Sequence, residues 1–169
     1  MDNYLNLLKT ILDNSRNLKN AATILLKASL NNPKLRPYAQ FMMYASIEEC
    51  GKFLLIMDHF QKSLSDRSLE NFGFYSHDEK IKRLVANIRK YESNVERDDV
   101  KIAKTIRKKL REVSVYVDFK DGKVIPPQFV KKKQSLYSLV SLSINCIKFC
   151  EFKLAKFKNK KSMPWPTKN

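Results

Sequence analysis

Apolar residues recur every three or four positions along most of the chain, which is the spacing of one face of an amphipathic helix. Near the start the repeat is built mainly from leucines, among them Leu5, Leu8 and Leu12. The same pattern returns in several later segments, separated by short breaks. It predicts helices over residues 2–30, 37–64, 77–91, about 98–113 and 128–158.

The first two helices are expected to form an antiparallel hairpin. The Asn-Asn-Pro run at 31–33 ends the first helix, and Pro37 fits the first turn of the second. Two long helices joined by such a short turn pack side by side in opposite directions. An antiparallel helical bundle follows from this arrangement.

The helical pattern stops between residues 116 and 127, where Asp121-Gly122 is a turn signal. We therefore expect a short β-like hairpin or loop before the last long helix. The chain has only three glycines, too few for the tight turns of an all-β or doubly wound fold. The prediction is an all-α fold with one domain over 1–160 and a basic tail, flexible or bound to a partner, at 161–169.

The chain carries 33 Lys and Arg against 17 Asp and Glu, a formal net charge of +16. Such an excess favours polyanionic partners, chiefly nucleic acid, although a lysine-rich surface also serves solubility. The charge is concentrated between residues 80 and 111, with twelve basic and four acidic residues. The candidate residues for contacts with a phosphate backbone are Lys82, Arg83, Lys101, Lys104, Lys108 and Arg111.

Several kinds of chemistry are disfavoured by the motifs. The sequence has no phosphate-cradling glycine loop, dinucleotide fingerprint, zinc cluster or serine nucleophile elbow, so we expect neither a metal nor a cofactor. Three cysteines form no metal-ligand pattern, and Cys146 and Cys150 share a helix face as buried, reduced thiols. No signal peptide and no run of 18 apolar residues is present, which predicts a cytoplasmic protein without a membrane span.

A polar motif, Glu48-Glu49-Cys50-Gly51-Lys52, interrupts the apolar second helix. A glycine inside a helix costs about 1 kcal/mol relative to alanine, so it indicates close packing or a functional reason. Both acids lie within one turn of the lysine. They are consistent with a surface ion pair, with a buried structural pair or with a catalytic group.

His77 and Lys80 open the third helix on the same face. The positive charge nearby and the helix N-terminus favour a neutral imidazole at His77, which suits a general base, and Lys80 is placed to hold a phosphate. An ordinary surface histidine fits the same pattern. His59, two turns beyond Lys52, is the second candidate imidazole.

These motifs, in this order and over roughly residues 18–150, resemble the AbiV abortive-infection family, placed among the HEPN helical domains of prokaryotic immunity. The resemblance includes Gly51 of the Glu-Glu-x-Gly-Lys motif and the pair Tyr116 and Asp118 of Tyr-Val-Asp-Phe. It implies a HEPN-like helical bundle, a homodimer, and a role in halting growth or translation during phage infection through RNA or ribosome-associated nucleic acid.

Many HEPN proteins are metal-independent ribonucleases that use an arginine and a histidine separated by four to six residues. This chain departs from that pattern, because the nearest arginine before His77 is Arg67, ten positions upstream. One hypothesis is a substitute catalytic site with His77 as acid or base. Its members are Glu48, Glu49, Lys52, His77 and Lys80. The alternative is a non-catalytic dimeric module switched by a phage or host protein.

Overall fold

The computed structural model describes residues 2–61, 76–90, 118–120, 123–125 and 136–161. Within these ranges the chain is built from four α-helices, one short 3-10 helix and one small hairpin, so the predicted all-α fold is confirmed. The elements are α1 (Asp2–Ala28), η1 (Pro33–Leu35), α2 (Arg36–Gln61), α3 (His77–Lys90), β1 (Asp118–Lys120), β2 (Lys123–Ile125) and α6 (Leu136–Lys161).

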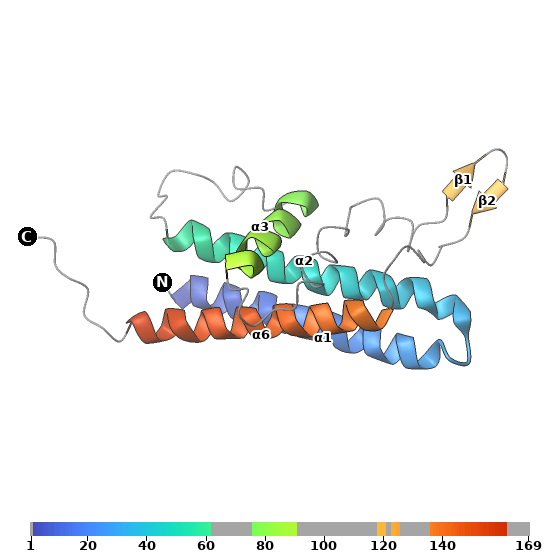
Figure 1. Cartoon of the computed structure of the whole chain (residues 1–169), viewed down its shortest axis with the longest axis horizontal. Helices are drawn as coiled ribbons and strands as arrows, with labels where there is room; N and C mark the ends of the chain where they lie inside the picture. Colours follow the sequence, from blue (N-terminus) through green and yellow to red (C-terminus); the bar gives the residue numbers. More distant parts are fainter. Residues whose placement is uncertain (1, 62–75, 91–117, 121–122, 126–135, 162–169) are drawn as a thin grey trace, which may run out of the picture.

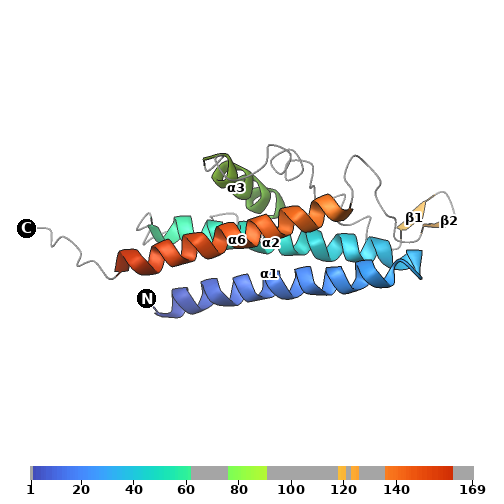
Figure 2. The ribbon, with the colours of Figure 1, turned by 60° about the horizontal axis from the view of Figure 1, so that its bottom comes forward.

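Three long helices lie side by side and the short α3 crosses one of them. Figures 1 and 2 show α1 and α2 running in opposite directions, as predicted, with α6 antiparallel to α1. Helix α2 contacts α1, α3 and α6, and α1 also contacts α6. The bundle therefore surrounds α2 on three sides, which explains why its sequence is apolar nearly all round rather than on one stripe.

The turn between α1 and α2 is built from the Asn-Pro residues that predict it in the sequence. The Asn32 side chain accepts a hydrogen bond from the Lys34 amide at 3.3 Å, and Pro33 opens the 3-10 helix that leads into α2. Proline is suited to this position because its missing N–H would have no partner there. The first helix ends at Ala28, two residues before the predicted end.

The core is centred on the middle of α2. Its largest fully buried side chains include Tyr44, Ile47 and Phe53 of α2, with Leu8 from α1 and Leu139 from α6. Each large side chain removed from water contributes about 1.5–3 kcal/mol, so this three-helix contact is the main source of stability. Polar residues inside α2 must therefore find partners within the protein.

A chain of buried hydroxyl and thiol groups joins the three long helices. The Ser46 hydroxyl lies 2.7 Å from the Ser143 hydroxyl and donates to the Ser15 carbonyl oxygen at 2.9 Å. Ser15 donates in turn to the Ser46 carbonyl oxygen at 2.9 Å and lies 3.3 Å from the Cys50 thiol. Small side chains at these positions let the helices approach closely and satisfy each other's polar groups.

The three cysteines are buried, as predicted, and none of them is in a disulfide bond. The Cys150 thiol lies 3.8 Å from the Cys50 carbonyl oxygen and can donate to it. Burial raises the pKa of Cys150 well above its usual value, so this thiol stays protonated at neutral pH. A protonated buried thiol behaves as a small apolar group, which is the role expected of these residues.

Ser46→Ala is expected to lower the free energy of unfolding by about 2 kcal/mol, because it removes the shared partner of two buried hydroxyl groups. Urea denaturation followed by circular dichroism measures this loss. Ser141→Ala is the matched control, since Ser141 is exposed on α6 and should change stability by less than about 0.5 kcal/mol. Equal effects of the two substitutions would contradict the structural role of Ser46.

Two short strands lie where the sequence predicts a hairpin. β1 and β2 pair in antiparallel register, with Asp118 opposite Ile125 and Lys120 opposite Lys123. The helix predicted over 98–113, the start of the last helix at 128–135 and the tail at 162–169 lie outside the described residues. None of the helices in the described part of the chain combines the length and apolar composition needed to cross a bilayer.

Candidate active site

The polar motif of α2 lies where α3 crosses it, and Gly51 is the point of closest approach. A Cβ atom added at Gly51 would lie 2.3 Å from the carbonyl oxygen of Lys80 and 2.7 Å from its carbonyl carbon. These distances are far below van der Waals contact, so no side chain fits there without moving the backbone of α3. The close packing predicted from a mid-helix glycine is confirmed.

Two side-chain contacts lie on either side of this crossing. The Glu48 carboxylate contacts His77 Nδ1 at 2.7 Å, and the Asp58 carboxylate accepts a bond from Arg83 at 2.9 Å. Glu48, Gly51 and Asp58 follow one another along α2 in the same order as their partners along α3. Helix α3 is thus fixed to α2 at three successive points.

The start of α3 is fixed by Ser76. Its hydroxyl accepts a hydrogen bond from the Glu79 amide at 3.3 Å, and its carbonyl accepts one from the Lys80 amide at 3.2 Å. Asp78 and Glu79 lie in the first turn, where the positive end of the helix dipole stabilises their negative charge. The Ser-x-x-Glu pattern of a capping box was present in the sequence as a signal for this start. This cap places His77 at the first helical position, beside α2.

The contact between Glu48 and His77 determines which nitrogen of the imidazole carries the proton. Because a carboxylate only accepts hydrogen bonds, Nδ1 must carry the proton. In the neutral ring the lone pair is then on Nε2, which is the arrangement of a histidine positioned for acid–base chemistry. The Glu48 side chain is 8% exposed and that of His77 is 27% exposed, so the pair is sheltered but reachable. The sequence hypothesis placed Glu48 and His77 in the same candidate site, and the structure adds their direct contact.

Glu49 and Lys52 form a second pair on α2, with Lys52 Nζ 2.5 Å from the Glu49 carboxylate. Their side chains are 14% and 20% exposed, so the pair is partly buried rather than fully solvated. Lys52 lies one helical turn from Glu48 and hence on the same face of α2. Lys80, by contrast, is buried at the crossing itself.

Two of the predicted phosphate-binding residues lie on α3, and both have acidic partners. Lys82 is exposed and pairs with Glu79, whose hydrogen bond raises the pKa of Lys82, while Arg83 pairs with Asp58. Asp58 was not among the residues predicted for the site. The remaining predicted positions Lys101, Lys104, Lys108, Arg111 and Tyr116 lie outside the described residues, as does the side chain of His59. Asp118 begins β1.

Within the described ranges, no three His, Cys, Asp or Glu side chains gather closely enough to hold a metal ion.

The comparisons with known proteins agree with the order of motifs along the chain. A family model described as AbiV, of the HEPN_AbiV type, matches residues 3–148. No curated protein and no solved structure matches the chain. The matched range includes α1, α2, α3, the hairpin and the first half of α6, and therefore the whole crossing of α2 and α3.

Proposed function

The chain belongs to the AbiV family of HEPN proteins, a family of abortive-infection defence, and we propose that it cleaves RNA as a metal-independent ribonuclease. The proposal includes a homodimer in the cytoplasm whose activity is released by a phage or host protein. RNA, free or within the translation machinery, is the substrate. The coarse assignment to antiviral defence rests on the family, and the reaction rests on the chemistry of the α2–α3 crossing.

The contact of Glu48 with His77 carries the proposal. In the proposed reaction Nε2 of His77 removes the proton of a ribose 2′-hydroxyl, whose oxygen attacks the adjacent phosphorus. A new P–O2′ bond forms and the P–O5′ bond breaks, and the leaving 5′-oxygen takes a proton from water while His77 later returns its proton to solvent. The products are a 2′,3′-cyclic phosphate and a 5′-hydroxyl, with no metal ion required.

The other predicted site residues receive different parts in this scheme. Glu48 orients the imidazole and stabilises its charged form after proton transfer, as the carboxylate of a catalytic triad does. Lys52, held by Glu49 one turn away, is the group assigned to the phosphate oxygens, because it is more exposed than Lys80. Lys80 contributes its backbone to the crossing, at its contact with Gly51.

A second candidate function is a non-catalytic dimeric module that a phage or host protein switches. One observation favours it: the contacts of Glu48, Asp58 and Gly51 all fix α3 to α2, as the parts of a structural interface would. In that case the acids stabilise the fold and no group of the site reacts.

Incubation of the purified protein with total RNA and tRNA in EDTA tests the first function. We expect cleavage with 2′,3′-cyclic phosphate ends, detected by sequencing of the fragments, either with the protein alone or after a lysate of phage-infected cells is added. The His77→Ala variant, purified in the same way, reveals any contaminating ribonuclease. RNA binding without cleavage under both conditions would contradict the ribonuclease and favour the module.

A further inference from the structure

A shallow pocket of about 250 Å³ lies between α1 and α6. It combines three basic side chains with two isoleucines and one acid. The residues that line it are Arg16, Lys19, Ile144, Ile147, Lys148 and Glu151. Ile147 is only 6% exposed, so the pocket has an apolar base below a charged rim.

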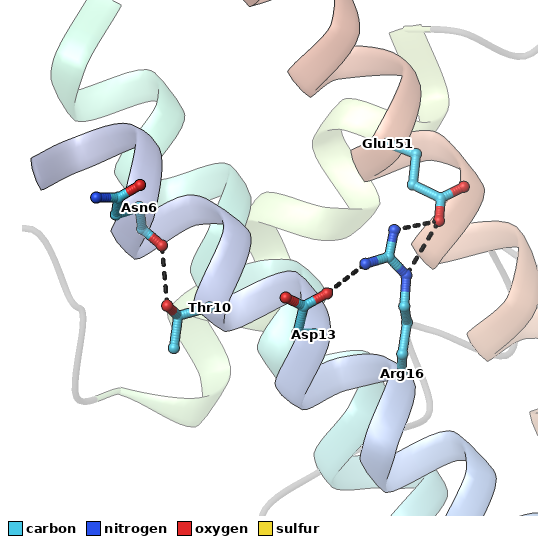
Figure 3. Close-up of polar contacts among 5 residues, drawn as sticks. All are labelled: Asn6, Thr10, Asp13, Arg16 and Glu151. Atoms are coloured by element: carbon cyan, nitrogen blue, oxygen red, sulfur yellow. Dashed lines mark hydrogen bonds and ion pairs between the residues drawn. The ribbon is translucent and has the colours of Figure 1, made fainter. Parts of the chain in front are cut away.

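The only acid in this lining is already used by Arg16. Glu151 accepts from Arg16 Nη2 at 2.6 Å and from its Nε at 3.2 Å, and Asp13 accepts from Nη1 at 2.5 Å (Figure 3). The hydrogen bond from Glu151 raises the pKa of Arg16, which keeps the guanidinium charged. Arg16 and Glu151 therefore neutralise each other at one end of the pocket.

Lys19 and Lys148 are the other two basic side chains of the lining, one on α1 and one on α6. None of the ion pairs made by the described part of the chain includes either of them. Two like charges that line one pocket repel each other, and an anion bound there would offset this repulsion.

We propose that the pocket between α1 and α6 binds a phosphate group, either of an RNA chain or of a free nucleotide. Lys19 and Lys148 bind the phosphate oxygens from opposite sides, and Ile144 and Ile147 contact the sugar. A typical pocket for a whole drug-sized ligand is about 300–1,000 Å³, so this one fits a phosphate with part of its nucleoside.

This pocket is separate from the Glu48–His77 pair. The pocket lining comes from α1 and α6, whereas Glu48 lies on α2 and His77 on α3. Binding here does not depend on cleavage, so the proposal goes beyond the ribonuclease function and stands or falls independently of it.

The test is fluorescence anisotropy of the full-length protein with a labelled 2′-O-methyl oligouridylate, which cannot be cleaved by attack of its own 2′-hydroxyl. The Lys19→Ala/Lys148→Ala variant is expected to bind about tenfold more weakly. The slope of log affinity against log salt should fall by about 0.7, the value for one neutralised phosphate on a single strand. Unlabelled uridine monophosphate distinguishes the sources: it displaces the probe if free nucleotide binds, and leaves it bound if the chain is required.

The matched control is Lys27→Ala/Lys34→Ala, which removes the same charge from exposed positions outside the pocket. It should weaken binding less than twofold, and circular dichroism should show that both variants keep the helical content of the wild type. Equal losses in the two double variants would overturn the proposal, because the effect would then be one of total charge. Displacement of the probe by polyglutamate as effectively as by unlabelled RNA would also overturn it and indicate an acidic protein partner.

Discussion

His77→Ala is expected to lower the rate of RNA cleavage at least about 100-fold, because general acid–base catalysis contributes about 10²–10⁴-fold to such reactions. Loss of the imidazole removes the group that we propose takes the proton from the 2′-hydroxyl. The contact with Glu48 at 2.7 Å is also lost, and a hydrogen bond to a charged group is worth about 2 kcal/mol of stability. The single variant therefore changes both chemistry and folding, and the two effects have to be separated.

The double variant Glu48→Gln/His77→Ala separates them. Glutamine has nearly the shape of glutamate but no charge, so a sheltered carboxylate is no longer left without its histidine. We expect the double variant to recover most of the lost stability, measured by urea denaturation, while cleavage stays at least about 100-fold below wild type.

The same pair of variants tests the interaction module. If His77 only fixes α3 to α2, then restored stability should restore phage resistance and partner binding in the double variant. Recovery of defence together with recovery of stability would thus contradict the catalytic role. Stability without defence would support it.

Helices and their turn were predictable because their signals are local. The spacing of Leu5, Leu8 and Leu12 repeats within one helix, and the Asn-Asn-Pro run determines a turn through its own side chains. The sequence therefore predicted α1, α2 and α3 to within a few residues. The position of Gly51 in the middle of a helix likewise indicated that another part of the chain packs closely against it.

The partners across helices were not predictable in the same way. Glu48 and His77 are 29 positions apart, and their contact depends on the angle at which α3 crosses α2. The motifs placed both residues in one candidate site but did not indicate which of the two acids, Glu48 or Glu49, contacts His77, and the sequence gave no indication of Asp58 as the partner of Arg83. Contacts between neighbours on one helix, such as Glu49 with Lys52, follow directly from helical spacing.

Gly51→Ala is expected to destabilise the protein by about 2 kcal/mol, although alanine is the better helix former. The gain in helix propensity is about 1 kcal/mol. Against it stands a Cβ atom 2.3 Å from the carbonyl oxygen of Lys80, an overlap with backbone that no side-chain rotation relieves. The steric term is the larger, so α3 must move away from α2. Urea denaturation measures the net change.

Asn20→Ala is the control for propensity alone, because Asn20 is exposed in the middle of α1 and should gain a few tenths of a kcal/mol. A Gly51→Ala variant more stable than wild type would show that the backbone of α3 does not pack closely against Gly51. Because Gly51 lies so close to the backbone of Lys80, the movement of α3 also separates His77 from Glu48, three positions before Gly51 on α2. The proposed cleavage should then fall with stability in Gly51→Ala, even though this residue has no group that could react. Gly51 thus sets the distance between the helices that carry Glu48 and His77.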